Sequence, residues 1–87
     1  MGAEVLRSEK GGYIKEDVLA KLDSLNALLF AVESGMPRDK AISELEKINS
    51  VELRREKAGF FGKFGFSAAD TDPYISELLK KITDALK

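Results

Sequence analysis

The feature of this sequence that most constrains its fold is a segment that occurs twice. Leu6–Tyr13 (LRSEKGGY) matches Leu53–Phe60 (LRREKAGF) at a constant offset of 47 residues, and five of the eight paired positions are identical. An internal repeat sets the architecture of a chain, so it is sought before other features. We predict one small domain, 1–87, with repeat copies at about 4–33 and 51–87.

The composition favours a small globular domain and argues against several classes of function. A chain of 87 residues buries only about 60–65% of its surface, so we expect modest stability unless it oligomerises. The formal net charge of −1 favours no nucleic-acid partner. Cysteine and histidine are absent, which argues against disulfides, imidazole catalysis and the usual zinc sites, and fits a cytoplasmic setting. No apolar run approaches the ~20 residues of a membrane span, and no signal-peptide pattern is present.

The clearest helix is predicted from Lys15 to Glu33. Apolar residues recur there at steps of 4, 3, 4 and 3, which forms a heptad seam of Val18, Leu22, Leu25, Leu29 and Val32. Three more apolar residues widen this seam into the face of a packed bundle: Leu19, Leu28 and Phe30. Within the helix, Asp17 and Lys21 are expected to form an ion pair one turn apart.

A second helix is predicted to fold back on the first. Gly35 suits the position just after a helix end, and Pro37 suits the first position of the next helix, which runs to about Asn49. So short a link predicts an antiparallel hairpin. The second helix is expected to bury a stripe of Ala41, Ile42, Leu45 and Ile48.

Two strands and a third helix complete the predicted fold, which is mainly α with a small β component (α+β). The residues of 51–55 alternate in polarity, and their likeness to the N-terminal copy predicts that 5–8 and 51–55 are short strands that pair, within one chain or across a dimer. The third helix is predicted from Asp72 to about Leu86, with Asp72 as its cap and Pro73 at its first position, and 67–70 can form a preceding turn with Ser67 as its cap. Its buried face is Ile75, Leu78, Leu79, Ile82 and Leu86.

The two halves also align in a second way, at an offset of 53. Gly12-Tyr13 is followed by Val18 and Leu22, and Gly65-Phe66 is followed by Thr71 and Ile75 at the same spacing. Glycine allows a sharp turn into a helix, the aromatic ring anchors the turn, and the next apolar positions begin the buried face.

This spacing resembles the DivIVA-like family of bacterial cell-division and polar-growth scaffolds. Its N-terminal domain has an aromatic residue, a short basic stretch and Gly-Tyr, followed by a helix. The resemblance implies a non-enzymatic scaffold domain at the inner face of the cytoplasmic membrane. Three departures stand out: Ile14 replaces the usual capping acid, the family has no proline where Pro73 lies, and the family's long parallel coiled coil is absent from this sequence. We therefore interpret the chain as a divergent or duplicated form of the motif domain. Because of Pro73, we do not expect a continuous helix from the Gly65-Phe66 turn.

The segment Gly59–Phe66 holds four phenylalanines. In the family that the chain resembles, an exposed aromatic beside a basic residue contacts the membrane, and the matching positions here are Lys63 and Phe64. The residues alone leave two alternatives open: all four rings pack on the core, or one or two are exposed and contact a membrane or protein. We predict that Phe61 and Phe64 are the most exposed rings, beside Lys63. The expected turn anchors are Gly12, Tyr13, Gly59, Phe60, Gly65 and Phe66.

No residue pattern in the chain predicts catalysis. Asp70 and Asp72, with Asp84 as a distant third acid, lack the remaining ligands and the glycine of a calcium loop, so helix capping is the better interpretation. The glycines of the Gly59–Phe66 segment do not have phosphate-loop spacing. We predict no catalytic residue, no cofactor and no metal.

Two functions from different classes remain. The first is a scaffold domain that forms a homodimer and contacts an anionic membrane surface. The second is a small adaptor or regulatory domain that binds a helix or peptide of another protein, with no membrane role.

Overall fold

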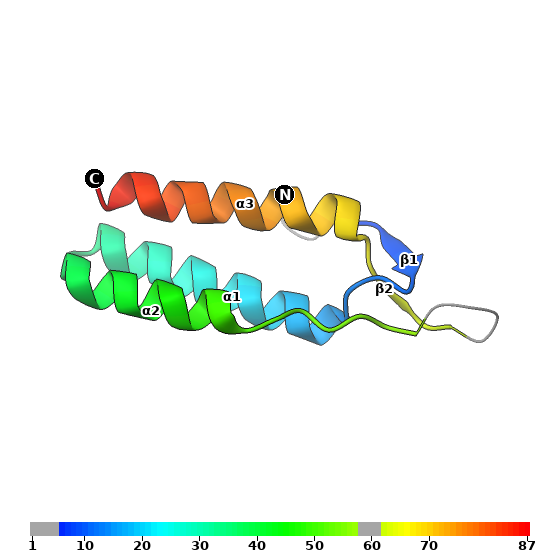
Figure 1. Cartoon of the computed structure of the whole chain (residues 1–87). Coiled ribbons are helices and arrows are strands. Elements are labelled where there is room, and N and C mark those ends of the chain that lie inside the picture. The colour runs from blue at the N-terminus through cyan, green and yellow to red at the C-terminus, as the bar shows by residue number, and fades with distance from the viewer. Residues whose placement is uncertain (1–5, 58–61) are drawn as a thin grey trace.

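The chain folds into three helices joined at one end by a small two-stranded antiparallel sheet (Figure 1). The structure is a computed structural model that describes residues 6–57 and 62–87. In chain order the elements are β1 (Ser8–Lys10), α1 (Lys15–Glu33), α2 (Arg38–Ser50), β2 (Phe64–Phe66) and α3 (Ala68–Ala85). The predicted class is confirmed: the fold is mainly helical with some β structure, and α1 and α2 pack together as a hairpin.

The bounds of α1 and α2 follow from their terminal residues. α1 spans the predicted residues, and Gly35 follows its end with a φ of 108°, a value that glycine adopts readily. α2 begins one residue later than predicted, because Pro37 occupies the cap position rather than the first helical position. Within α2, Ala41 is fully buried, and the other residues of its predicted stripe are half-buried: Ile42, Leu45 and Ile48.

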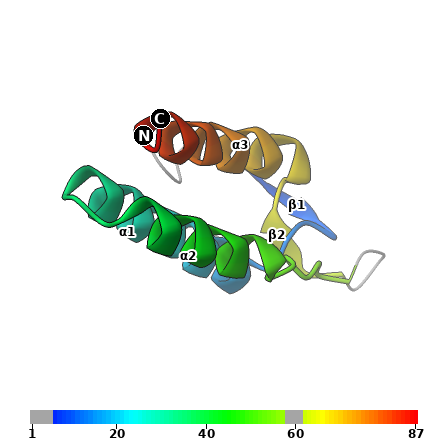
Figure 2. The ribbon, with the colours of Figure 1, turned by 60° about the vertical axis from the view of Figure 1, so that its left-hand side comes forward.

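The core lies mainly between α1 and α3, which begin at the same end of the molecule and run in the same direction (Figures 1 and 2). Its buried side chains follow matched heptad steps on the two helices: Val18, Leu22 and Leu25 on α1, and Thr71, Ile75, Leu78 and Ile82 on α3. Such spacing is typical of parallel helices packed along one seam. This parallel pair was not predicted from the sequence.

The apolar face of α1 is narrower than predicted. Leu28 is buried, as expected, but Leu19 is 44% exposed and Phe30 is 72% exposed. At 100° per residue, both lie on a flank of the helix that neither α2 nor α3 covers. Their exposure leaves apolar surface on the outside of the α1–α3 pair.

The predicted start of α3 is wrong. The helix begins at Ala68 with Ser67 in the cap position, and the Thr71 N–H donates to the Ser67 carbonyl at 2.8 Å. Pro73 therefore lies inside the helix, where it cannot donate a hydrogen bond to the carbonyl of Ala69. Because Ala69 is exposed, water can satisfy that carbonyl. The helix thus runs continuously from the Gly65-Phe66 turn, against the expectation drawn from Pro73.

The predicted strand pairing is also wrong. β1 pairs antiparallel with β2, with Glu9 opposite Gly65, whereas Arg55 forms only an isolated bridge with Tyr13. The two Leu-Arg segments, 6–10 and 53–57, are called the arms. Each arm pairs with the Gly-aromatic turn of the other half, because the two turns, Gly12-Tyr13 and Gly65-Phe66, lie together between them. Val5, which was part of the predicted strand, lies outside the described residues.

One polar atom in the seam gives a testable expectation. The Thr71 hydroxyl is buried and has no hydrogen-bond partner, and the matching position in α1 is the fully buried Val18. Thr71→Val keeps the shape and removes the cost of burying that hydroxyl, so we expect the free energy of unfolding to rise by about 1 kcal/mol in urea titrations. In the control Thr83→Val, the lost hydroxyl donates to the Leu79 carbonyl, so no gain is expected. A loss of stability in Thr71→Val would contradict this account.

Candidate interaction site at the aromatic end

The two Gly-aromatic turns cross at the end of the molecule where α1 and α3 begin (Figure 1). The Tyr13 N–H donates to the Phe66 carbonyl at 2.9 Å, and the Phe66 N–H donates to the Tyr13 carbonyl at 2.8 Å. A Cβ on Gly12 would lie 2.9 Å from the Gly65 carbonyl carbon, and one on Gly65 would lie 2.7 Å from that of Gly12. Only glycine lets the two backbones approach so closely.

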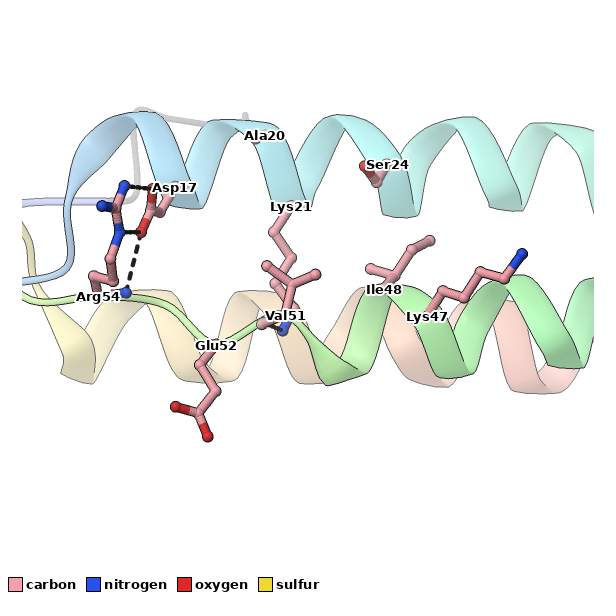
Figure 3. Close-up of a pocket in the computed structure, with 9 residues that line it drawn as sticks. All are labelled: Asp17, Ala20, Lys21, Ser24, Lys47, Ile48, Val51, Glu52 and Arg54. Carbon is pink, nitrogen blue, oxygen red and sulfur yellow. Dashed lines mark hydrogen bonds and ion pairs between the residues drawn. The ribbon is translucent and has the colours of Figure 1, made fainter.

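Two arginine–aspartate pairs hold the arms to the opposite helices. Arg7 donates from Nε and Nη2 to both carboxylate oxygens of Asp70, at 2.8 and 3.0 Å. Arg54 does the same to Asp17, at 2.9 and 2.8 Å (Figure 3). In each pair the arginine backbone N–H also donates to the same carboxylate. Such bidentate pairs fix the relative orientation of the arginine and the carboxylate, in addition to the attraction between their charges.

The contacts of the two halves correspond to each other. Arg7 and Arg54 are related by the offset of 47, and Asp17 and Asp70 by the offset of 53. Each arginine binds the aspartate of the other half, as is expected of two copies around a local twofold axis. The repeat itself remains a prediction. The two alignments of the halves, at offsets of 47 and 53, were the signal for these four residues, which the sequence reasoning missed as a set.

The arginines alter the acidity of their partners. Hydrogen bonds from Arg54 lower the pKa of Asp17 to about 2, and those from Arg7 lower the pKa of Asp70 to about 2. The prediction of an ion pair between Asp17 and Lys21 is therefore wrong. The Asp17 carboxylate binds Arg54, and the Lys21 ammonium donates to the Val51 carbonyl at 2.9 Å.

These pairs predict a loss of stability in acid. An unfolded aspartate has a pKa of about 3.9, so a lowered folded value stabilises the fold above pH ~4, and this contribution is lost as pH falls towards 2. We expect the Tm, followed by circular dichroism, to fall across this range, and Asp17→Asn to flatten the fall. Glu46→Gln changes an exposed carboxylate with no cation partner among the described residues, and should leave the slope unchanged. Equal slopes for Asp17→Asn and the parent would contradict this role.

Cations also lie over the central rings. The Lys15 ammonium is 5.3 Å from the centre of the Phe66 ring, and the Arg55 guanidinium is 5.3 Å from that of Tyr13. The Tyr13 hydroxyl donates to Asp72 at 2.9 Å, and this hydrogen bond raises the pKa of Tyr13. Phe66 and Tyr13 are thus held in place, as turn anchors should be.

Phe64 and Phe66 lie on the same short strand but differ in exposure. Phe66 is buried at 8% exposure, whereas Phe64 is 56% exposed and follows the exposed Lys63. Phe30 on α1 is more exposed, at 72%, but of the two rings of the Gly59–Phe66 segment that the structure describes, Phe64 is the exposed one and Phe66 the buried one, as predicted. Gly59, Phe60 and Phe61 lie outside the described residues, and their predicted roles stay predictions.

The surface also has a groove where α1, α2 and the segment after α2 meet (Figure 3). It has a volume of about 530 Å³, and its apolar lining comes from Ala20, Ile48 and Val51. Lys21 crosses to the Val51 carbonyl, and the Arg54–Asp17 pair closes one end. These contacts fasten the segment after α2 to α1.

The described acids do not assemble a metal site. The Asp70 carboxylate accepts hydrogen bonds from Arg7, and the Asp72 carboxylate accepts one from the Tyr13 hydroxyl. Neither aspartate is the cap of α3, because the cap is Ser67. Within 6–57 and 62–87, no group of three metal-ligating side chains is present. Over the same ranges, no helix has the length and apolar character that crossing a bilayer requires.

Comparisons with family models, with curated proteins and with solved structures gave no match to this chain.

Proposed function

We propose that this chain is a non-enzymatic interaction domain, related to the DivIVA-like scaffolds of bacterial division and polar growth, that attaches to an anionic membrane surface through Phe64 and Lys63. The observation that carries the proposal is the exposure of Phe64, at 56%, on a strand whose other ring is buried. A large exposed ring next to a lysine is typical of a surface that meets lipid or protein.

The structure offers a physical basis for such attachment. The molecule extends over 48 × 24 × 15 Å, and β2 lies at the end of the three-helix body where α1 and α3 begin (Figures 1 and 2). Burial of a phenylalanine contributes about 1.5–3 kcal/mol, and a lysine near an anionic surface adds about 1 kcal/mol. One such end would therefore bind at lipid concentrations in the millimolar range or above.

The non-enzymatic part of the proposal has support of its own. The carboxylates with a strongly lowered pKa, Asp17 and Asp70, are held by arginines and fix the turns in place. Their shifts follow from structural ion pairs, which also perturb pKa values away from active sites. The Gly-aromatic turns that lead into α1 and α3 also suit the spacing on which the family resemblance rests.

The test is co-sedimentation with vesicles. At about 5 mM anionic phosphatidylglycerol lipid, we expect a measurable share of the parent protein in the pellet, and at least about tenfold weaker binding by Phe64→Asp, because it loses the ring and adds a negative charge. Val51→Asp makes the same change in charge at a side chain that is 60% exposed and lies away from β2, and should bind like the parent.

The outcome also decides between the two classes of function. Binding that requires anionic lipid and is lost in Phe64→Asp supports the membrane proposal. Equal recovery of the parent and Phe64→Asp, or no recovery of either, removes the membrane proposal and leaves the protein-adaptor function.

A further inference from the structure

The charge of the chain is unevenly distributed along its length. The described residues at the sheet end of the molecule, 6–11, 55–57 and 62–66, are called the tip (Figure 1). The tip holds five cationic side chains and two carboxylates, a net charge of +3: Arg7, Lys10, Arg55, Lys57 and Lys63, with Glu9 and Glu56. The other described residues hold nine cations and twelve carboxylates, a net charge of −3. The near-neutral charge of the whole chain therefore conceals a cationic end.

The two arginines of the tip bind groups of the protein itself. Arg7 pairs with Asp70, and the Arg55 guanidinium donates to a backbone carbonyl at 3.0 Å. The lysines differ, because all three of their side chains are exposed. Within 6–57 and 62–87, neither Lys57 nor Lys63 forms an ion pair. These two lysines thus present their charge to solvent.

Backbone contacts bring the three lysines together beside Phe64. Lys10 lies opposite Phe64 in the antiparallel register of β1 and β2, so the two side chains leave the sheet on the same face. The Lys63 N–H donates to the Lys57 carbonyl at 3.1 Å, and the Lys63 carbonyl accepts from the Gly11 N–H at 3.2 Å. The backbone of Lys63 therefore lies between the segments that carry Lys10 and Lys57.

We propose that Lys10, Lys57 and Lys63 act together as a docking site for the phosphates of neighbouring lipid headgroups. This inference rests on the proposed function, to which it adds two lysines and the chemistry of the lipid. The occupant is a lipid surface because three segments present the lysines beside an exposed apolar ring, and a layer of phosphates above acyl chains offers both chemistries. The net charge of −3 on the other described residues is repelled by an anionic surface, so the tip faces it.

The proposal sets the strength of attachment. A lysine near an anionic surface strengthens binding about fivefold, so two lysines beyond Lys63 strengthen it about 25-fold. Half of the protein should then bind at about 0.1 mM lipid, whereas Phe64 and Lys63 alone would require lipid in the millimolar range.

The experiment titrates the whole chain with vesicles of phosphatidylglycerol and phosphatidylcholine, from about 0.01 to about 10 mM lipid, and follows co-sedimentation. Lys57→Gln should raise the lipid concentration for half binding about fivefold, and the double variant Lys10→Gln/Lys57→Gln about 25-fold. Lys80→Gln is the matched control, since it removes an exposed lysine near the other end of α3, and it should bind like the parent. Circular dichroism should show unchanged helix content, because all of these side chains are exposed.

The outcomes separate this inference from the proposed function. Equal binding by Lys57→Gln and the parent, with binding lost in Phe64→Asp, would overturn the lysine site and leave the proposed function in place. No binding by the parent at about 10 mM lipid would overturn both. Release of the bound parent by about 5 mM inorganic phosphate at matched ionic strength would indicate a site for one phosphate, and would overturn docking to a lipid surface.

Discussion

Gly65→Ala is expected to prevent the chain from folding. The new Cβ would lie 2.7 Å from the backbone carbonyl carbon of Gly12, and the hydrogen bonds between Tyr13 and Phe66 hold both backbones in place. Because backbone atoms cannot rotate away, we expect a loss of more than about 3 kcal/mol, which is a large part of the stability of a domain this small. Circular dichroism and the dispersion of amide resonances would report the loss of structure.

Gly35→Ala is the control for this effect. A Cβ there would meet nothing within 4 Å, so its cost comes from the φ of 108° alone, or about 1–2 kcal/mol. Gly12→Ala should behave like Gly65→Ala, since its Cβ would meet the backbone of Gly65 and Phe66. A folded Gly65→Ala protein with a stability close to that of Gly35→Ala would contradict the close crossing of the two turns.

Leu25→Ala is expected to have the next largest effect. Leu25 is fully buried at the centre of the seam between α1 and α3. Removing a buried leucine side chain costs about 2–5 kcal/mol through lost burial and the cavity that remains. The free energy of unfolding in urea would measure this loss, and Val51→Ala, at a 60% exposed residue, should change it by less than about 0.5 kcal/mol. A loss below about 1 kcal/mol in Leu25→Ala would show that the seam does not hold the fold together.

The local elements were the part of the fold that the sequence could predict. Lys15–Glu33 was predicted with its observed bounds, because its heptad spacing and the turn at Gly35 are local signals. The start of α3 was missed because Pro73 suggested the first position of the helix, although a proline in the second turn costs only one hydrogen bond to an exposed carbonyl. That error also concealed the parallel pairing of α1 and α3.

The pairing of the arms failed for a different reason. The similar sequences of Leu6–Tyr13 and Leu53–Phe60 suggested that these two segments contact each other. In a twofold arrangement, each arm instead contacts a different part of the other half, as Arg7 does with Asp70. Sequence similarity shows which residues correspond, but it does not show which residues touch.

The candidate site was predicted in part. Phe66 is buried as an anchor and Phe64 is exposed beside Lys63, which follows from the alternation of side chains along a strand. The exposure of Phe30 could not be predicted, because its position on α1 fits a broad apolar face as well as an outer flank. The paired roles of Arg54 and Asp17 depend on contacts between segments far apart in the chain.

The most direct test of membrane attachment uses tryptophan, which the chain lacks. Phe64→Trp places a single fluorophore at the proposed contact, and Phe30→Trp places one at an exposed ring away from it. On addition of anionic vesicles, we expect the emission of Phe64→Trp to shift to shorter wavelength while that of Phe30→Trp stays unchanged, with no shift in either for zwitterionic vesicles. An unchanged emission of Phe64→Trp with anionic vesicles would contradict the proposed function.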